Sequence, residues 1–236
     1  MDKKLSKIAA IVEACSADFF TYLDEVLSNE IKVALEIIQE QTKVYLFSGL
    51  IRNYFLASLE YRDVDVVLAD EIDVYKSFPT KTVTQNSFGG YKIQFDSGPL
   101  DLWFMKDTWA FRQRKQKELD FQLEKTIPAT VFFNFSAVLF CINEKAFYFT
   151  SPFLEFLASR ELDYVDKNNA NYGLCVVNSF YYAQKYKLSI SKRLLNYLKA
   201  LDSAVEYDYE AIQQKHFKKI IFSNNLLKQK LQKNIK

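Results

Sequence analysis

Short apolar and alternating segments fill the middle of the chain. The clearest is 62–68, where acidic and apolar residues alternate with the period of two that indicates a half-buried strand. A small-residue turn, Ser48-Gly49, separates a short apolar segment from a helix-like stretch at 50–59. The expected strands are residues 43–47, 62–68, 91–95 and 100–105, and 131–140 with 146–149 form an expected hairpin.

Both ends of the chain carry apolar residues at helical spacing instead. Residues 3–41 hold two apolar stripes, which predict two helices, the second capped by Ser28. A composition shift near residue 165 divides an expected head with N-terminal helices, residues 1–165, from an expected helical domain, residues 166–236. The predicted fold class is α+β, a small mixed or antiparallel sheet flanked by helices. From Pro152 onward the expected helices are residues 152–160, 169–187, 191–202 and 207–233.

Composition narrows the class of protein without naming a function. The chain is 49% hydrophobic and 25% charged, as globular proteins are, and its net charge of +2 names no partner. Three cysteines, far apart in sequence, fit a reducing compartment and predict neither disulfides nor a zinc site. The longest apolar segment, 130–142, is too short to span a membrane. We therefore expect a cytoplasmic protein with no membrane partner.

Three aspartates are the candidate catalytic residues. Asp63 and Asp65 are two residues apart in the expected strand, so their carboxylates point to the same face. Asp101 stands between Leu100 and Leu102 and faces away from these apolar neighbours. Carboxylates suit Mg²⁺ or Mn²⁺, and two such metals activate an attacking hydroxyl and neutralise a leaving pyrophosphate. All three aspartates are therefore also the candidate metal ligands.

The turn before the helix-like stretch is the candidate phosphate site. The backbone N–H groups of a small-residue turn and of a helix N-terminus can hold phosphates. We therefore expect Ser48 and Gly49 to bind the β- and γ-phosphates of a nucleoside triphosphate.

The motif 47–56, followed by Arg62-Asp63-Val64-Asp65, resembles the head of class II CCA-adding enzymes and bacterial poly(A) polymerases. These belong to the polymerase-β-like nucleotidyltransferase superfamily.

The resemblance covers residues 40–200 and adds two nucleotide-binding candidates. Arg52 matches the family arginine, and Lys106 replaces a usual arginine. Asn53 replaces a family aspartate, and Asp101 falls at the third family carboxylate. The resemblance implies a metal-dependent enzyme that moves a nucleoside monophosphate from a triphosphate to an acceptor hydroxyl, an RNA 3′ end in this family. Arg52 has an alternative role as a structural ion-pair partner.

Departures from the family keep other functions open. Asn178 and Tyr181 stand where family members carry arginines, and no element that reads the incoming base is found. One alternative is transfer to a protein, a small molecule or another nucleotide, as in toxin or defence enzymes. A second is a non-catalytic module that binds nucleotides or RNA and keeps the fold.

The C-terminal segment is basic. Between Ala211 and Lys236 there is no acidic residue. Such a segment can neutralise RNA phosphates, and a solvated helix would have the same composition. The sequence predicts RNA as a possible partner through this helix and leaves the oligomeric state open. The lysines concerned are Lys215, Lys218, Lys219, Lys228, Lys230, Lys233 and Lys236.

Overall fold

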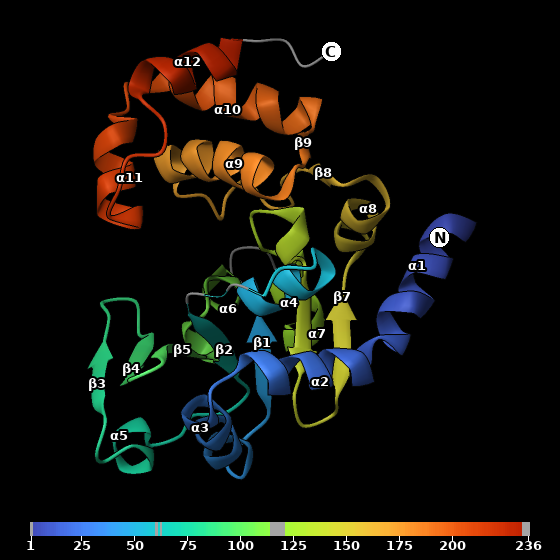
Figure 1. Ribbon diagram of the computed structural model, residues 1–236, viewed down its shortest axis with the longest axis vertical. Coiled ribbons are helices and arrows are strands. Elements are labelled where there is room, and N and C mark those ends of the chain that lie inside the picture. The colour runs from blue at the N-terminus through green and yellow to red at the C-terminus, as the bar shows by residue number, and fades with distance from the viewer. Residues whose placement is uncertain (1, 60, 62, 114–120, 233–236) are drawn as a thin grey trace.

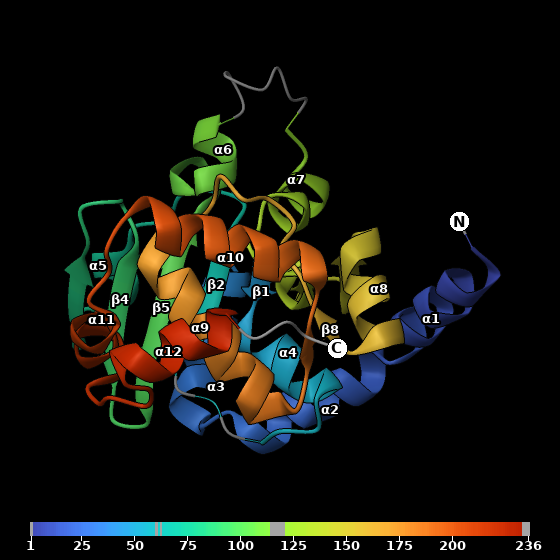
Figure 2. The same cartoon turned by 90° about the horizontal axis from the view of Figure 1, so that it is seen from above.

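The computed structural model describes residues 2–59, 61, 63–113 and 121–232. Its helices α9 to α12 gather at one end of the molecule, and a sheet with its own helices forms the rest (Figure 1). Seen from above, α9, α10 and α12 lie over β5, β2 and β1 (Figure 2). Arg62, Lys233 and Lys236, which the sequence analysis singled out, lie outside the described residues.

The sheet has seven strands in the order β3-β4-β5-β2-β1-β6-β7. Among the described strands of this sheet, β2 and β5 pair in parallel and the other neighbours pair antiparallel. The predicted mixed sheet is therefore confirmed, with one strand, β3, that the sequence did not predict. The strands are β1 Val44–Phe47, β2 Val64–Leu68, β3 Thr82–Gln85, β4 Tyr91–Phe95, β5 Gly98–Phe104, β6 Val138–Cys141 and β7 Ala146–Phe149.

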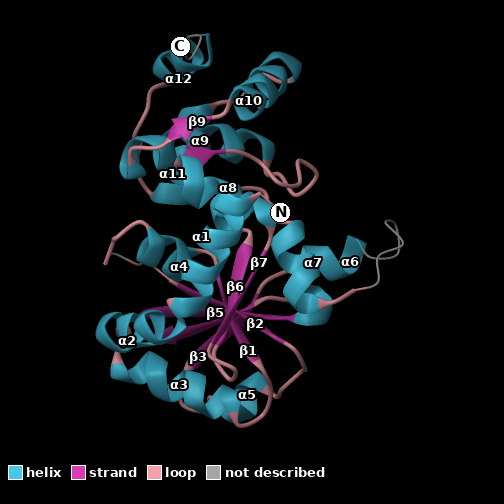
Figure 3. Cartoon of the chain, turned by 90° about the vertical axis from the view of Figure 1, so that its right-hand side faces the viewer, coloured by secondary structure: helices cyan, strands magenta, loops and turns pink. Residues whose placement is uncertain are grey.

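Helices cover both faces of this sheet (Figure 3). On one face Val64, Val66 and Leu68 join the main core, where Phe19 of α2 packs on Phe140 with ring centroids 4.7 Å apart. On the other face Val67 packs with residues of α6 and α7. Because side chains alternate along a strand, Asp65 shares this second face with Val67. Asp65 and Asp101 are only partly buried there, so α6 and α7 leave part of the face open.

Three helices replace the two expected at the N-terminus. The chain interrupts the first apolar stripe at Cys15, so α1 packs on α8 while α2 contributes Phe19 to the core beneath the sheet. Ser28 is confirmed as a cap, because its Oγ accepts a hydrogen bond from the Ile31 N–H at 3.3 Å. The helices are α1 Lys3–Ala14, α2 Ser16–Val26 and α3 Asn29–Gln39.

The middle of the chain contains short helices that have little sequence signal. The expected helix at 50–59 is α4, which ends at Phe55, and the N-terminal half of the expected strand 131–140 is largely a 3₁₀ turn, Asn134–Ser136. The amide of Asn134 explains that change, because it bonds to the backbone of Glu161 and Asp163 instead of a neighbouring strand. These helices are α4 Gly49–Phe55, α5 Val74–Ser77, the 3₁₀ turn Met105–Asp107, α6 Trp109–Gln113 and α7 Leu123–Ala129.

The C-terminal region is helical, as predicted, with two differences. The expected helix 207–233 is broken at Lys218, whose φ of 59° is left-handed, and becomes α11 and α12. Two short strands, β8 Glu161–Leu162 and β9 Ser189–Ile190, pair in parallel, so this pairing joins residues on both sides of the expected boundary. The helices are α8 Ser151–Ser159, α9 Tyr172–Tyr186, α10 Lys192–Ala204, α11 Tyr209–Phe217 and α12 Asn224–Gln232.

A single buried amide holds the turn between α11 and α12. Gln213 is 0% exposed, and its Nε2 donates to the carbonyls of Tyr209 and Phe222 at 2.9 and 2.8 Å. Its Oε1 accepts from the N–H groups of Ile221 and Phe222 at 3.0 and 2.9 Å. All hydrogen-bonding capacity of this amide is thus used to fix a segment that carries no regular structure of its own.

We expect Gln213→Ala to lower the free energy of unfolding by about 3 kcal/mol, because it leaves buried backbone groups without partners. Gln214→Ala is the matched control, since Gln214 is exposed and should change stability by less than about 0.5 kcal/mol. Thermal and denaturant unfolding of both variants would measure the difference. Equal stabilities would show that other contacts hold the turn.

Candidate active site

The parallel pairing of β2 and β5 places two of the candidate carboxylates side by side. Asp65 is in direct register with Asp101, and on its other side Asp65 pairs with Phe47 of β1. Neighbouring strands are about 4.8 Å apart, so the two aspartates are adjacent on the open part of the sheet face. Asp63, just before β2, lines the same cavity as Asp65.

Lys92 extends this row by one strand. It is opposite Asp101 in the antiparallel pairing of β4 and β5, and its ammonium group forms an ion pair with the Asp101 carboxylate. Lys92 has no signal in the sequence that marks it, because only the strand register shows that it is opposite an aspartate. Three charged side chains therefore lie side by side on neighbouring strands, with Lys92 on β4, Asp101 on β5 and Asp65 on β2.

Magnesium is the metal that the family resemblance implies for these carboxylates. Within the described parts of the chain, no group of three His, Cys, Asp or Glu side chains could hold a metal ion. Magnesium is commonly bound by one or two carboxylates together with substrate phosphates and water. Asp65 and Asp101 match that smaller requirement in ligand type and in register. The Lys92 ammonium is the cation beside Asp101 in this structure.

The turn after β1 brings Ser48 and Gly49 to the same place. Ser48 has φ 58° and ψ −97°, an unusual conformation for a residue with a side chain. Strain of this kind costs on the order of 1–3 kcal/mol and concentrates at functional sites. A Cβ added to Gly49 would meet nothing nearer than Arg52 Nη2 at 4.0 Å, so the backbone there is open to close approach. Both residues line a cavity with Asp63 and Asp65.

Arg52 is held by aromatic rings from the helical region. Its guanidinium lies 5.0 Å from the ring centroid of Tyr182 and 5.2 Å from that of Tyr186, both in α9. Phe135 supplies a third ring at 5.3 Å. Cation–π contacts of this kind stabilise the position of a guanidinium. Arg52 therefore fastens the turn region to α9.

Asn53 completes this connection. Its Oδ1 accepts hydrogen bonds from Arg52 Nε and Nη2 at 3.1 and 3.0 Å, and from the Tyr186 hydroxyl at 3.0 Å. Burial raises the pKa of the neighbouring Tyr22, and the positive charge of Arg52 opposes that shift. Arg52 also lines the cavity beside Ser48, so its structural contacts and a contact with a bound ligand are compatible.

The cavity between the sheet and the helical region, called the inter-lobe cavity below, has a volume of about 600 Å³. Its floor is the turn 48–49 with Asp63 and Asp65. Residues of α9 form one wall, and residues 216–219 at the end of α11 form another. The cationic residues among its described lining are Arg52, Lys185, Lys218 and Lys219, with His216 beside them.

The basic C-terminal segment therefore divides into parts with different surroundings. Lys218 and Lys219, at the break that ends α11, line the inter-lobe cavity together with Asp63 and Asp65. Lys228 is 3.7 Å from a Glu206 carboxylate oxygen, and Lys230 lies over two phenylalanine rings. Sequence composition could not distinguish these groups of lysines.

Lys106 does not lie with the other residues that the sequence predicted for nucleotide binding. It follows the end of β5, five residues beyond Asp101, and its Nζ is 2.5 Å from a Glu71 carboxylate oxygen. The hydrogen bond to Glu71 raises the pKa of Lys106. This ion pair lies at the end of the sheet away from the Ser48 turn.

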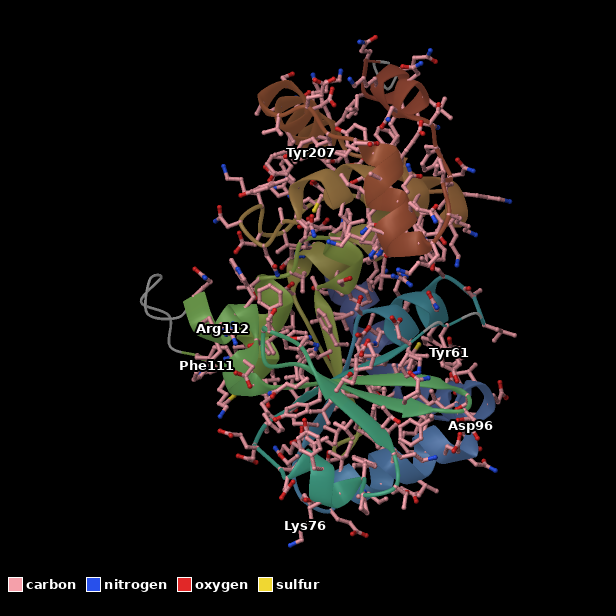
Figure 4. All side chains as sticks on the ribbon, turned by 90° about the vertical axis from the view of Figure 1, so that its left-hand side faces the viewer. Tyr61, Lys76, Asp96, Phe111, Arg112 and Tyr207 are labelled. Atoms are coloured by element: carbon pink, nitrogen blue, oxygen red, sulfur yellow. The ribbon has the colours of Figure 1, made fainter. Side chains whose placement is uncertain are left out.

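A second cavity, called the sheet-face cavity below, has a volume of about 360 Å³ and also reaches Ser48 and Asp65. It lies against the strand face under α6 and α7, and its lining is mainly apolar. In Figure 4, Arg112 from this cavity and Tyr61 from the inter-lobe cavity lie on opposite sides of the molecule. Asp65 is therefore shared by two cavities that extend in different directions.

Comparison with known proteins identifies the fold. No protein-family model and no curated protein matches the sequence. Solved structures of CCA-adding enzymes match this chain in fold, so the predicted resemblance is confirmed for the fold. At 12–15% identity this likeness shows the fold alone.

Structures that share this fold include CCA-adding and tRNA-processing enzymes. A CCA-adding enzyme complexed with CTP has a TM-score of 0.62 and 12% identity, over 85% of this chain and 51% of that one. The Thermotoga maritima CCA-adding enzyme complexed with tRNA gives 0.58 and 12%, over 81% and 46%. A tRNA-processing enzyme with CTP gives 0.53 and 15%, over 73% and 46%. The chain spans about half the length of these structures.

In the described chain, no helix is both long and apolar enough to cross a membrane.

Lys92→Met should increase the affinity for Mn²⁺ severalfold, because it removes a cation that competes for the Asp101 carboxylate. Lys106→Met is the matched control, since it breaks a similar ion pair away from the aspartates and should leave the affinity unchanged. Electron paramagnetic resonance titration would measure free and bound Mn²⁺. Unchanged or weaker binding by Lys92→Met would contradict the expectation.

Proposed function

We propose that the protein is a metal-dependent nucleotidyltransferase that moves a nucleoside monophosphate from a triphosphate to an acceptor hydroxyl. The observation that carries the proposal is the register of Asp65 with Asp101, beside a strained Ser48 turn and a cavity with cationic walls. The fold likeness to CCA-adding enzymes supports the same reaction class.

The inter-lobe cavity is our proposed triphosphate site. Lys218 and Lys219 line it together with Ser48 and Gly49, so phosphates bound there would meet both cations and backbone N–H groups. Tyr181 and Tyr182 in the α9 wall offer rings on which a base can stack. Every base has a flat face that can stack on such a ring, so stacking does not select one base. This agrees with the sequence, in which no element that reads the incoming base is found.

The acceptor oxygen would form a bond to the α-phosphorus while the bond from that phosphorus to the bridging oxygen breaks. Pyrophosphate leaves with the bonding electron pair, and Asp101 accepts the proton of the acceptor hydroxyl. Asp65 and Asp101 would hold Mg²⁺ or Mn²⁺, with Asp63 in the lining of the same cavity as Asp65, and the metal when bound would supply positive charge for the attacking and leaving oxygens. Ser48 and Gly49 fix the β- and γ-phosphates, and Arg52 keeps that turn against α9.

An RNA 3′ end is the acceptor we favour. One structure with the same fold is a CCA-adding enzyme complexed with tRNA, and the cations at 218 and 219 provide a basic approach to the site. Transfer to a protein, a small molecule or a nucleotide uses the same chemistry and is separated by the labelled product. A binding module without activity would show triphosphate-dependent thermal stabilisation and no product.

Asp65→Asn should reduce nucleotidyl transfer by at least about 10²-fold with the melting temperature unchanged, because it removes a charge on which the reaction depends. The assay offers each α-labelled nucleoside triphosphate with Mg²⁺ or Mn²⁺, total cellular RNA and cell protein. Asp96→Asn is the control, since Asp96 is exposed in the β4–β5 turn and should retain full activity. Equal rates for Asp65→Asn and the unmodified protein would refute the proposal.

Lys218→Ser with Lys219→Ser should weaken triphosphate binding by about tenfold or more, because two charge-assisted contacts are lost. Lys215→Ser with Lys228→Ser removes the same charge at positions that do not line the cavity and should have little effect. Isothermal titration with a non-hydrolysable triphosphate would compare them. Equal losses in both pairs would mean that net charge, and not the cavity wall, sets the affinity.

A further inference from the structure

The sheet-face cavity lies beside the proposed reaction centre, and the triphosphate site does not use it. It shares Ser48 and Asp65 with the inter-lobe cavity, so a ligand in each cavity would meet at the same aspartate. Its volume of about 360 Å³ is within the range of small-ligand sites. Two adjoining cavities at one carboxylate are the arrangement that a two-substrate transfer reaction needs.

The two cavities differ in charge. Arg112 is the only lysine or arginine among the described residues that line the sheet-face cavity. Its Nη2 donates to the Phe88 carbonyl at 2.7 Å and lies 3.5 Å from Asp107 Oδ1. The Asn169 amide donates to the Thr130 carbonyl, and the Thr130 hydroxyl donates within α7. This lining therefore favours an uncharged group, whereas the inter-lobe cavity favours phosphates.

Aromatic side chains give the sheet-face cavity its shape. Trp103 and Trp109 line it together with Phe47 and Phe88. Trp103 packs so closely on Gly90 that a Cβ there would lie 2.6 Å from the indole ring, which fixes the position of that ring. Flat rings held in this way offer a stacking surface to another flat ring.

The cavity also lies on the correct side of the carboxylates. Trp103 follows Asp101 by two residues in β5, so both side chains stand on the same strand face. A group bound against Trp103 can thus present a hydroxyl to Asp101 and Asp65. The triphosphate would approach the same pair from the Ser48 side, which suits an in-line transfer.

We propose that the sheet-face cavity binds the acceptor through a nucleobase-sized aromatic ring, with the hydroxyl of its sugar directed to Asp65 and Asp101. The acceptor is thus a nucleoside, either free or at the 3′ end of an RNA. The role of the bound nucleoside as acceptor rests on the proposed function. Binding of a nucleoside in the sheet-face cavity does not depend on that function.

The chain has its own reporter for this cavity. Its two tryptophans are Trp103 and Trp109, and both line the sheet-face cavity. Titration of the intact protein with adenosine or cytidine should quench or shift tryptophan fluorescence with saturation, while ribose 5-phosphate, which has no base, should not. A short single-stranded RNA with a 3′ hydroxyl is the second probe. An RNA that binds at least tenfold more tightly than the nucleosides indicates an RNA end, and equal affinities indicate a free nucleoside.

Two variants test the location. Trp109→Ala removes one wall and leaves Trp103 as reporter, and it should weaken nucleoside binding at least tenfold without changing triphosphate affinity. Phe88→Ala changes a side chain that is 64% exposed, so it should fold normally and weaken binding severalfold. Tyr75→Ala removes a similarly exposed ring outside the cavity and is the control. Nucleoside binding that these cavity variants leave unchanged, or that Lys218→Ser with Lys219→Ser abolishes, would overturn the proposal.

Activity assays separate the two hypotheses. Saturable, Trp109-dependent binding without any transfer would refute the proposed function and retain the cavity as a nucleoside site. Transfer with an acceptor KM that Trp109→Ala and Phe88→Ala leave unchanged would refute the cavity assignment and retain the enzyme. The proposal expects both binding and a KM for the acceptor that rises in the two variants, with little change in the KM for the triphosphate.

Discussion

The parallel pairing of β2 with β5 is the constraint on which the site depends. It sets Asp65 beside Asp101 in a sheet whose other pairs are antiparallel. A shift of one residue would turn one of the carboxylates into the core. The buried faces of Val64, Val66 and Leu100 make such a shift costly, because each would then lose its place in the main core. The hydrophobic pattern that builds the sheet therefore also determines where the charges meet.

A second constraint joins the sheet to the helical region. Arg52 contacts three rings and the Asn53 amide, and the Tyr186 hydroxyl bonds to the same amide. These contacts cross from α4 to α9, the two elements on either side of the inter-lobe cavity. Packing between an arginine and aromatic rings therefore joins two of the elements that line the cavity.

Sequence patterns predicted the features that depend on residues close together in the chain. The strands around Asp65 and Asp101, the turn at Ser48 and the cap at Ser28 follow from periodicity and residue type, and the structure contains them. The position of Lys92 opposite Asp101 depends on strand register, which composition does not reveal. The break at Lys218 has no glycine or proline to mark it in the sequence, and the buried amide of Gln213, five residues before it, holds the turn that follows. The contact of Arg52 with three rings likewise cannot be predicted without the position of α9 in the fold, because α9 supplies two of the rings.

The composition of the inter-lobe cavity has a consequence for the order of folding. Its floor comes from residues 48–65, whereas its walls come from residues 181–186 and 216–219. The sheet itself also closes late, since β1 pairs with β6 across about ninety residues of chain. A growing polypeptide would therefore display its aspartates long before it could enclose a ligand. Ligand capture therefore has to wait until the chain has emerged past α11, because only then are both sides of the cavity present.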